Sequence, residues 1–217
     1  SSSWEPLRVQ DPYSFRCIAQ VHGASFEVID HVRKVIDREL NAVTDNPLVF
    51  EDGRILSGGN FHGQALAFAL DYLALGVCEL ASLSERRIEK MTSIRGKEDL
   101  PPFLIRESGL NSGFMIPHVV SAALVSENKI LAHPASVDSI PTSAGQEDHV
   151  SMGPIAGCKS LKILENTANV LAIELLCACQ AIDILNFESK LPETLSSMYA
   201  KIRSMSEFLT SDRSLSL

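Results

Sequence analysis

Apolar residues recur every three or four positions along most of the chain, the periodicity of a helix with one buried face. The pattern predicts four long helices, at residues 15–43, 61–91, 115–132 and 147–185, and a shorter amphipathic segment at 192–209. The first helix is marked by Phe15, Ile18, Val21, Val28, Val32, Val35, Ile36, Leu40 and Val43. In the fourth helix, Pro154 and Gly157 are expected to bend or restart the first turns.

Turn-forming residues separate these helices. "TDNP" (44–47) ends the first one, because Pro47 disfavours helical backbone at the residue before it. "LVFEDGRILS" (48–57) places two short β-forming runs around Asp52-Gly53, and "GGN" (58–60) is expected to be a flexible joint. Loops are predicted at 93–113 and between the third and fourth helices. The fold class is therefore mainly α: one bundle of long helices over residues 1–217, with a small β-hairpin near 48–57.

The length of the helices predicts an oligomer. A helix of about 30 residues spans about 45 Å, more than the width of a compact domain of this size. Other chains are expected to cover its flanks, so we expect a homo-oligomer.

Composition and charge exclude several partners. The net charge is −8 and no run of Lys and Arg forms a basic stripe, so we expect no nucleic-acid and no anionic-membrane partner. Asp71, Glu79 and Ser82 interrupt the apolar stretch 65–83, which argues against a membrane span. The first residues lack the features of a secretory signal peptide. Five irregularly spaced cysteines predict reduced, mostly buried thiols, as in a cytoplasmic protein.

"QDPYSFR" (10–16) is the first candidate site. If a helix begins near Pro12, Tyr13 and Arg16 share a face, with Gln10 just before them. A phenol, a guanidinium and an amide at one helix start can bind a carboxylate and transfer a proton. The alternative is a surface helix start in which Asp11 is the cap and Arg16 is solvated.

"SGGNFHG" (57–63) lacks both the Lys of a phosphate-binding loop and the strand context of a dinucleotide site. Gly58-Gly59 would let the backbone pass close to another group while Asn60, Phe61 and His62 face a cavity. The alternative is a tight turn before a helix.

"QEDHVSMG" (146–153) gathers acids and a histidine. A metal site would join Glu147 and His149 to His133 or His118, but the spacing matches no zinc pattern, so no metal is expected. The alternative is a helix start, with Ser143 and Gln146 as a capping box and two acids at the positive end of the dipole. Capping does not exclude a catalytic use of the same carboxylates.

"SLSERRIEK" (82–90) places like charges four residues apart, in the pairs Glu85–Glu89 and Arg86–Lys90. Such pairs repel on a helix, so support must come from the Arg86–Glu89 pair or from other elements. We expect a structural or intersubunit ion network.

Together, these segments resemble the histidine ammonia-lyase branch of the aromatic amino-acid ammonia-lyase family. The landmarks are "QDPYSFR", "NAVTDNPLVF", "SGGNFHG", "SLSERR", "LPPFL", "NSGFMI", "SENK", "HPASVDSIPTSAGQEDHVSMG" and "LAIELLCACQ". The phenylalanine enzymes typically carry Gln after "GGNF", and a His-Asn-Gln run where this chain reads "GQEDH". His62 and Glu147 therefore favour histidine as the substrate.

The resemblance implies non-oxidative elimination of ammonia from L-histidine to give trans-urocanate. It implies that Tyr13 is a catalytic acid/base and that Arg16 pairs with the substrate carboxylate. Glu147 would face the imidazole or help to remove the β-proton. Gln10, Phe61 and His62 complete the implied substrate-binding set. Full-length members of the family are tetramers whose active sites draw on several subunits.

The resemblance also implies a prosthetic group, 4-methylidene-imidazol-5-one, which the family forms from an Ala-Ser-Gly tripeptide. The nearest strings are "GASF" (23–26) and "TSAG" (142–145), so this sequence does not encode it. The family places the tripeptide upstream of "QDPYSFR", and the finish "SDRSLSL" has no clear cap. The expectation is a C-terminal portion of a longer subunit, inactive alone.

Three alternatives stay open. The chain could be a non-catalytic helical assembly module that kept the scaffold. It could be one subunit of a split ammonia-lyase whose partner carries Ala-Ser-Gly. It could also keep the fold and act on another aromatic amino acid, as a lyase or an aminomutase.

Overall fold

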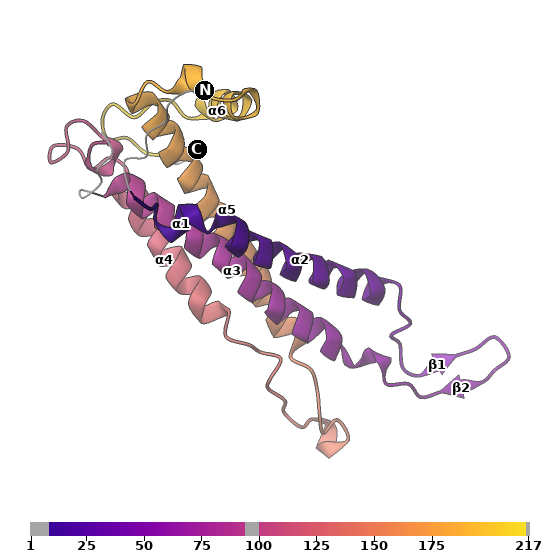
Figure 1. Ribbon diagram of the computed structural model, residues 1–217. Helices are drawn as coiled ribbons and strands as arrows, with labels where there is room; N and C mark the ends of the chain where they lie inside the picture. Colours follow the sequence, from indigo (N-terminus) through magenta and orange to yellow (C-terminus); the bar gives the residue numbers. More distant parts are fainter. Residues whose placement is uncertain (1–8, 94–99, 216–217) are drawn as a thin grey trace. The chain divides into compact units, whose positions relative to one another are not determined.

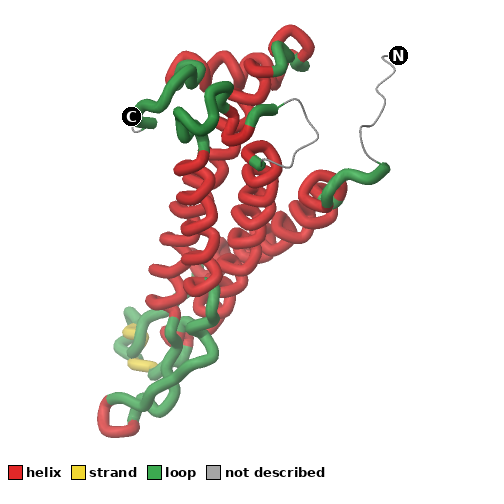
Figure 2. Tube along the Cα trace, turned by 90° about the vertical axis from the view of Figure 1, so that its left-hand side faces the viewer, coloured by secondary structure: helices red, strands yellow, loops and turns green. Residues whose placement is uncertain are grey.

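A computed structural model describes residues 9–93 and 100–215, which are mainly helical (Figure 1). The α-helices in these residues are α1 (Tyr13–Arg16), α2 (Ile18–Leu40), α3 (Gln64–Thr92), α4 (Met115–Leu131), α5 (Gly153–Ile184) and α6 (Glu193–Met205). Strands β1 (Leu48–Val49) and β2 (Ile55–Leu56) pair antiparallel, Leu48 opposite Leu56. Short 3₁₀ turns are η1 (Asn60–His62), η2 (Pro102–Leu104), η3 (Ser143–Gly145) and η4 (Glu188–Lys190). The predicted fold class, mainly α with one β-hairpin near 48–57, is confirmed (Figure 2).

Three predicted helix boundaries were wrong. The first helix is interrupted at Cys17 and ends at Leu40 rather than at 43. The second begins at Gln64, because Gly63 takes a left-handed backbone (φ 75°) that separates it from η1. The fourth begins at Gly153 rather than at 147, so Pro154 stands in its first turn, where its missing N–H costs no hydrogen bond. The third helix agrees with its prediction to within one residue.

The chain divides into two compact units, each with its own hydrophobic clusters. Unit 1 consists of residues 1–20, 80–127 and 166–217, and unit 2 of residues 21–79 and 128–165. Helices α3 and α5 contribute residues to both. The expectation that residues 1–217 form one portion of a helical bundle stays a prediction.

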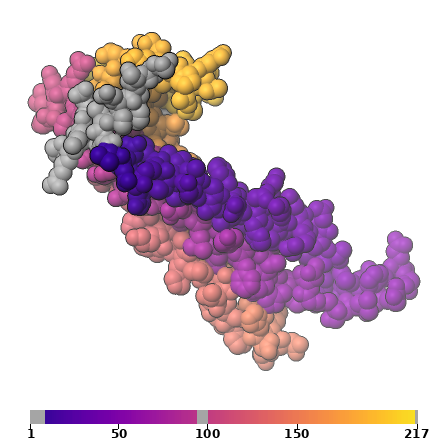
Figure 3. Space-filling model, in the orientation of Figure 1, coloured from indigo at the N-terminus to yellow at the C-terminus, as the bar shows by residue number. Residues whose placement is uncertain are grey.

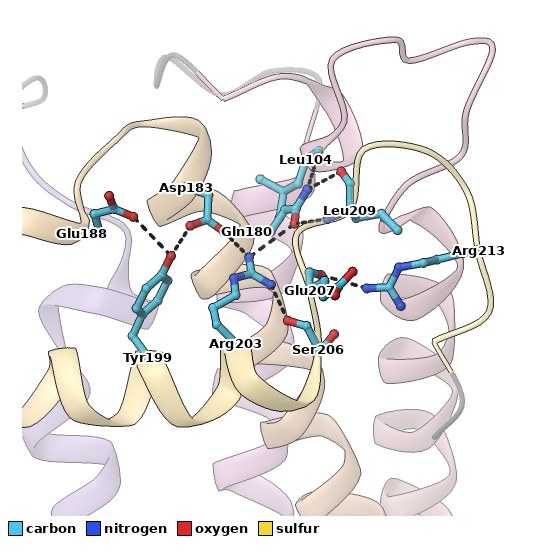
Figure 4. A network of polar contacts seen from close by, with 10 residues as sticks. All are labelled: Leu104, Gln180, Asp183, Glu188, Tyr199, Arg203, Ser206, Glu207, Leu209 and Arg213. Carbon is cyan, nitrogen blue, oxygen red and sulfur yellow. Dashed lines mark hydrogen bonds and ion pairs between the residues drawn. The ribbon is translucent and has the colours of Figure 1, made fainter.

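The core of unit 1 joins the second halves of α3 and α5 to the segments around 104 and 209. Its buried members are Ala81, Ile88, Leu104, Ile105, Phe114, Val170, Cys177, Ala181 and Leu209. Gln180 lies fully buried at its edge and is hydrogen-bonded at both ends of its amide (Figure 4). Its Nε2 donates to the carbonyls of Leu104 (3.1 Å) and Leu209 (2.9 Å), and its Oε1 accepts from the Leu209 amide (3.0 Å).

Helix α6 is attached to the end of α5 by a neighbouring polar network (Figure 4). Asp183 accepts hydrogen bonds from the Tyr199 hydroxyl and from the Arg203 guanidinium, and the side chains of Asp183 and Arg203 are largely buried. The hydrogen bond to Asp183 stabilises the protonated phenol and raises the pKa of Tyr199 to about 12. The hydroxyl of Tyr199 is therefore a structural donor at neutral pH.

Unit 2 packs α2 against the first half of α3. Val32 and Val35 of α2 lie buried against Ala69 of α3. Closer to the middle of α3, Gly76 allows a tight approach, since a Cβ at this position would lie 2.8 Å from a γ-carbon of Val28. The β-hairpin lies beyond the ends of these two helices and stands out from them in the space-filling view (Figures 1 and 3).

Two helical stretches are long and apolar enough to cross a membrane, by length and composition only: Asn60–Thr92 and Gly153–Ile184. The sequence argument against such a span at 65–83 relies on Asp71, Glu79 and Ser82. In the structure Asp71 is buried and accepts the Ser136 amide (2.7 Å), so it does not expose a charge on the helix. Core helices of soluble proteins meet the same criteria, and the two stretches therefore assign no membrane.

The five cysteines are all unpaired. Cys177 and Cys179 are buried, Cys17 and Cys78 are partly buried, and Cys158 is exposed. Burial raises the pKa of the Cys78 thiol to about 11 and also raises that of Cys177. The two thiols thus stay protonated at neutral pH, where they are poor nucleophiles.

Candidate functional site

The first group of predicted site residues lies in unit 1, on the four-residue helix α1. The Arg16 guanidinium lies over the Tyr13 ring, 4.7 Å from its centroid, so the two side chains share a face as the spacing predicted. Both are exposed, as is Gln10. In the alternative interpretation Asp11 is the cap, but Pro12 is the N-cap, and Asp11 uses its backbone carbonyl to accept from Arg16 Nε (3.3 Å).

Helix α1 is too short to be stable by itself, and a buried cation holds it. Ser14, on the face opposite the solvent, is buried, and its carbonyl accepts a hydrogen bond from Arg87 Nη1 of α3 (3.5 Å). Arg87 is paired with Glu174 of α5, and Ser84 Oγ donates to the same carboxylate (2.6 Å). Thus the segment that carries Tyr13 and Arg16 is tied to a buried ion pair.

This ion pair confirms that "SLSERRIEK" is supported by other elements. Glu85, almost fully buried, is paired with Arg86 and lies 3.3 Å from His118 Nε2 of α4. The expected Arg86–Glu89 pair is replaced by Arg86–Glu85. The sequence had not indicated Glu174 as the partner of Arg87, since 87 residues separate them.

The second group lies in unit 2, around the loop that joins α4 to α5. Glu147 is exposed and lies six residues before α5, so the predicted capping box at Ser143 is wrong. Ser143, Ala144 and Gly145 have φ angles of 51°, 55° and 86°, which a right-handed helix does not tolerate. The three residues turn the chain back on itself, and Thr142 pairs with Glu147 in an antiparallel bridge.

Hydrogen bonds fix the Glu147 carboxylate inside this turn. Thr142 Oγ1 donates to Glu147 Oε2 at 2.5 Å, and the backbone amide of Thr142 donates to the Glu147 carbonyl at 2.9 Å. The hydroxyls of Thr142 and Ser143 hold the pKa of the Glu147 carboxyl below its ordinary value. An exposed, ionised carboxylate in a fixed position can accept a hydrogen bond from a cationic or N–H-bearing ligand.

His62 connects this loop to η1. Its Nε2 lies 3.1 Å from both Nδ1 and the carbonyl oxygen of His149, and the two rings stack with centroids 5.2 Å apart. Ser151 Oγ donates to the His62 carbonyl at 2.7 Å. His149 and Ser151 are residues whose contact with His62 the sequence did not reveal, although both stand in the motif that contains Glu147. Phe61 lies beside His62 in η1 and is more than half exposed.

The expected flexible joint at 58–60 is held by hydrogen bonds instead. Gly58 N donates to Asn46 Oδ1 at 2.9 Å, and Asn60 Nδ2 donates to the Val43 carbonyl at 2.8 Å. The base of the hairpin is therefore closed, and it supports η1 with Phe61 and His62.

The structure thus brings together Tyr13 with Arg16 in unit 1, and His62 with the Glu147 loop in unit 2. Within residues 9–93 and 100–215, no cluster of three or more His, Cys, Asp or Glu side chains could hold a metal ion. His118 contacts Glu85, and the carbonyl of His133 accepts from Lys159. These contacts do not involve Glu147.

The similarity to known proteins extends over nearly the whole chain. A histidine ammonia-lyase of Geobacillus sp. (strain WCH70) is 55% identical over 208 residues, which are 95% of this chain and 41% of that protein. The crystal structure of a histidine ammonia-lyase from Trypanosoma cruzi is 53% identical, with a TM-score of 0.88 over 95% of this chain and 41% of that one. A tyrosine aminomutase from Streptomyces globisporus is 36% identical, with a TM-score of 0.91 over 99% of this chain and 41% of that one.

The chain therefore spans about two fifths of the length of these relatives. The sequence profile of the family described as aromatic amino acid lyase matches residues 1–204, more than nine tenths of the chain. On this match and on the identity to its relatives, the chain belongs to the aromatic amino acid lyase family.

Proposed function

We propose that this chain is part of a histidine ammonia-lyase, which removes ammonia non-oxidatively from L-histidine and releases trans-urocanate. The observation that carries the proposal is Glu147, an exposed carboxylate held in a tight turn by Thr142 and kept ionised by the same hydroxyl. A fixed anion suits the N–H of an imidazole and has no partner on a phenyl ring. The relatives named histidine ammonia-lyase, at 53–55% identity, support the same substrate.

The lowered pKa of Glu147 separates its two possible roles. A general base works best when its pKa lies near the working pH, and a carboxyl with a lowered pKa is a weaker base. We therefore assign Glu147 to imidazole binding rather than to removal of the β-proton.

The amino-acid end of the substrate suits Tyr13 and Arg16. Arg16 is exposed and can bind a carboxylate by donating two parallel hydrogen bonds, and the phenol of Tyr13 shares its face. We propose Tyr13 as the catalytic acid/base, Arg16 as the carboxylate anchor and Gln10 as a supporting donor. Phe61 is exposed and lies next to His62, whose ring contacts the loop that carries Glu147. We propose that Phe61 lines the part of the site that holds the aromatic ring of the substrate. The ring of His62 already contacts His149, so we assign it no substrate contact.

The elimination also requires an electrophile that activates the amine, and the family obtains it from methylidene-imidazolone. These 217 residues contain no Ala-Ser-Gly, so they do not fit the group and cannot form it. We propose that the polypeptide of these residues alone has no ammonia-lyase activity. A polypeptide that carries Ala-Ser-Gly must supply the group.

We further propose a cytoplasmic homo-oligomer, a tetramer as the family resemblance implies. Each unit exposes large apolar side chains on its helices. In unit 2 they include Phe26, Phe68, Tyr72 and Leu75, and in unit 1 they include Ile116, Val119, Leu171 and Leu175. Burial of such rows between subunits would remove them from water.

A chimera tests the function. Residues 1–204 would replace the matching part of the Geobacillus enzyme, which supplies the rest of a subunit. We expect the chimera to convert L-histidine to urocanate, measured by urocanate absorbance, and the 217-residue chain alone to give none. A chimera that folds and assembles but produces no urocanate would refute the proposal. Production of a β-amino acid from L-tyrosine would instead favour the aminomutase alternative, which the similarity to the tyrosine aminomutase supports.

A further inference from the structure

We infer that His62 and His149 are positioning residues for Glu147: their side chains hold the turn that presents its carboxylate, and neither binds the substrate. The inference rests on the proposed function in that Glu147 binds the imidazole. It reassigns His62, which the sequence placed in the substrate-binding set.

The first step is the protonation of the pair. His62 Nε2 lies 3.1 Å from the His149 carbonyl oxygen, which can only accept a hydrogen bond. His62 must therefore carry its proton on Nε2 and donate it. His149 Nδ1, at the same distance of 3.1 Å, can accept from the same N–H in the tautomer that carries its proton on Nε2. The Nε2–H group of His62 thus faces two acceptors of the same residue, His149.

The second step is the stiffness of the connection. Ser151 Oγ donates to the His62 carbonyl at 2.7 Å, so the loop contacts both the ring and the backbone of His62. Gly63, next in the chain, has a φ of 75°, and a Cβ on it would lie 3.4 Å from Ser151 Oγ. The loop and the end of η1 therefore meet closely at His149 and at Ser151.

The third step leads from His149 to Glu147, two residues away. The loop is closed at its base by Ser139 Oγ, which accepts the Val150 amide at 2.9 Å, and at its tip by the Thr142–Glu147 bridge. These bonds lie within residues 139–150 and do not fix the loop to the rest of unit 2. Before this segment, Ser136 anchors the loop to Asp71 and Gln64 of α3. The contacts of His62 with His149 and Ser151 attach it on the far side of the turn, and the direction of the Glu147 carboxylate depends on them.

Two pairs of matched variants test the inference. In His62→Gln the side-chain amide can donate from the place of Nε2, whereas in His62→Leu the volume is similar and the donor is lost. In His149→Asn the amide oxygen takes the place of Nδ1 and accepts, whereas His149→Leu cannot. If the two histidines position Glu147, His62→Gln and His149→Asn should keep the turn and its carboxylate in place. Both Leu variants should lose this positioning.

The first readout is amide hydrogen exchange in the full 217-residue chain, which needs no activity. We expect His62→Leu to accelerate exchange at Thr142 and Glu147 about fivefold to tenfold, the effect of one lost hydrogen bond. His62→Gln should change it less than about twofold. Unchanged protection in α5 would show that the unit stays folded. If His62→Leu left both loop amides as protected as in the parent chain, the inference would be wrong.

The second readout is kcat/KM for L-histidine in the chimera, with and without Glu147→Gln. Because His62 acts through Glu147, His62→Leu should lower kcat/KM in the chimera that keeps Glu147. In the chimera with Glu147→Gln, the same change should lower kcat/KM little further. Full additivity would mean that His62 contacts the substrate itself, and would overturn the inference. A chimera without any turnover refutes the proposed function, and the exchange experiment then still decides the role of His62.

Discussion

The guanidinium of Arg87 in α3 and the carboxylate of Glu174 in α5 form a largely buried ion pair, with Arg87 Nη2 2.7 Å from Glu174 Oε2. Only 10% of the Arg87 side chain and 18% of the Glu174 side chain are exposed. Arg87 Nη1 donates to the carbonyl of Ser14 in α1, and the Ser84 hydroxyl donates to the Glu174 carboxylate. The pair therefore links two long helices to the segment that carries Tyr13 and Arg16.

Arg87→Met should lower the free energy of unfolding by about 3 kcal/mol, because it leaves a buried carboxylate without its cation. Chemical denaturation measures the change. Replacing both partners, as Arg87→Met with Glu174→Leu, should recover much of this loss, since no charge is then left buried.

The exposed pair Arg33–Asp30 gives the control. Its side chains are 70% and 43% exposed, so Arg33→Met should barely move the denaturation midpoint. If Arg87→Met were equally mild, the pair would not be the structural link that its burial indicates. A double variant as unstable as the single one would show that the lost packing, and not the uncompensated charge, decides the effect.

Periodicity in the sequence was enough to place α4, and α3 apart from its start, because an apolar stripe at helical spacing reports burial on one side. The two short β-forming runs around Asp52-Gly53 were enough to place the hairpin. The start of α5 was missed because Ser143 and Gln146 match a capping box. What decides this segment is the left-handed backbone of residues 143–145, which no local pattern reports.

The candidate site was predicted in part for the same reason. The spacing of Tyr13 and Arg16 is a local property, and the structure shows their contact. The contacts of His62 with His149 and of Arg87 with Glu174 each span 87 residues. Such pairings are set by the tertiary fold, so they cannot be read from spacing along the chain.

Two glycines in unit 2 should respond to alanine with opposite signs. Gly76→Ala places a Cβ 2.8 Å from a γ-carbon of Val28 and should destabilise the unit by about 1–3 kcal/mol, the usual range for overpacking. Gly23→Ala in α2 meets no atom within 4 Å and should stabilise by up to about 1 kcal/mol through helix propensity.

Thermal or chemical denaturation of the two variants checks this prediction. Val28→Ala provides the matched test, because it removes the γ-carbons that a Cβ at position 76 would meet. Gly76→Ala should therefore cost less in the Val28→Ala background than in the parent chain. An equal cost in both backgrounds would show that the α2–α3 approach is not limited by this contact.

Asp212 should make the stability of unit 1 depend on pH in the acid range. Its carboxylate accepts the amides of Ser112 and Gly113, each at 2.8 Å, and these hydrogen bonds hold its pKa below the ordinary value of 3.8. A carboxyl with a lower pKa in the folded state stabilises the fold above its unfolded pKa. That contribution is lost as the pH falls through the folded pKa.

The denaturation midpoints of the parent chain and of Asp212→Asn should therefore differ by a constant amount above about pH 5 and converge below about pH 3.8. Asp148→Asn, at an exposed position in unit 2, is the control. A difference between the parent and Asp212→Asn that persisted unchanged to low pH would contradict the role of the charged carboxylate.

Glu147→Gln should change the choice of substrate rather than activity in general. The amide keeps the shape of the side chain but loses the charge, and a hydrogen bond to a charged group is stronger than one to a neutral group. In the chimera with the Geobacillus enzyme, kcat/KM for L-histidine should therefore fall by about 10- to 100-fold. Any turnover of L-phenylalanine should stay the same or rise, because a phenyl ring offers Glu147 no N–H.

The neighbouring acid supplies the matched control, since Asp148→Asn removes one charge from the next position in the same loop. We expect it to leave the ratio of the two substrates nearly unchanged. An equal loss on L-histidine and L-phenylalanine in Glu147→Gln would place the carboxylate in the chemical step common to both, as a base. A shift confined to L-histidine separates recognition of the imidazole from catalysis and leaves the proton transfer to another group, for which we propose Tyr13.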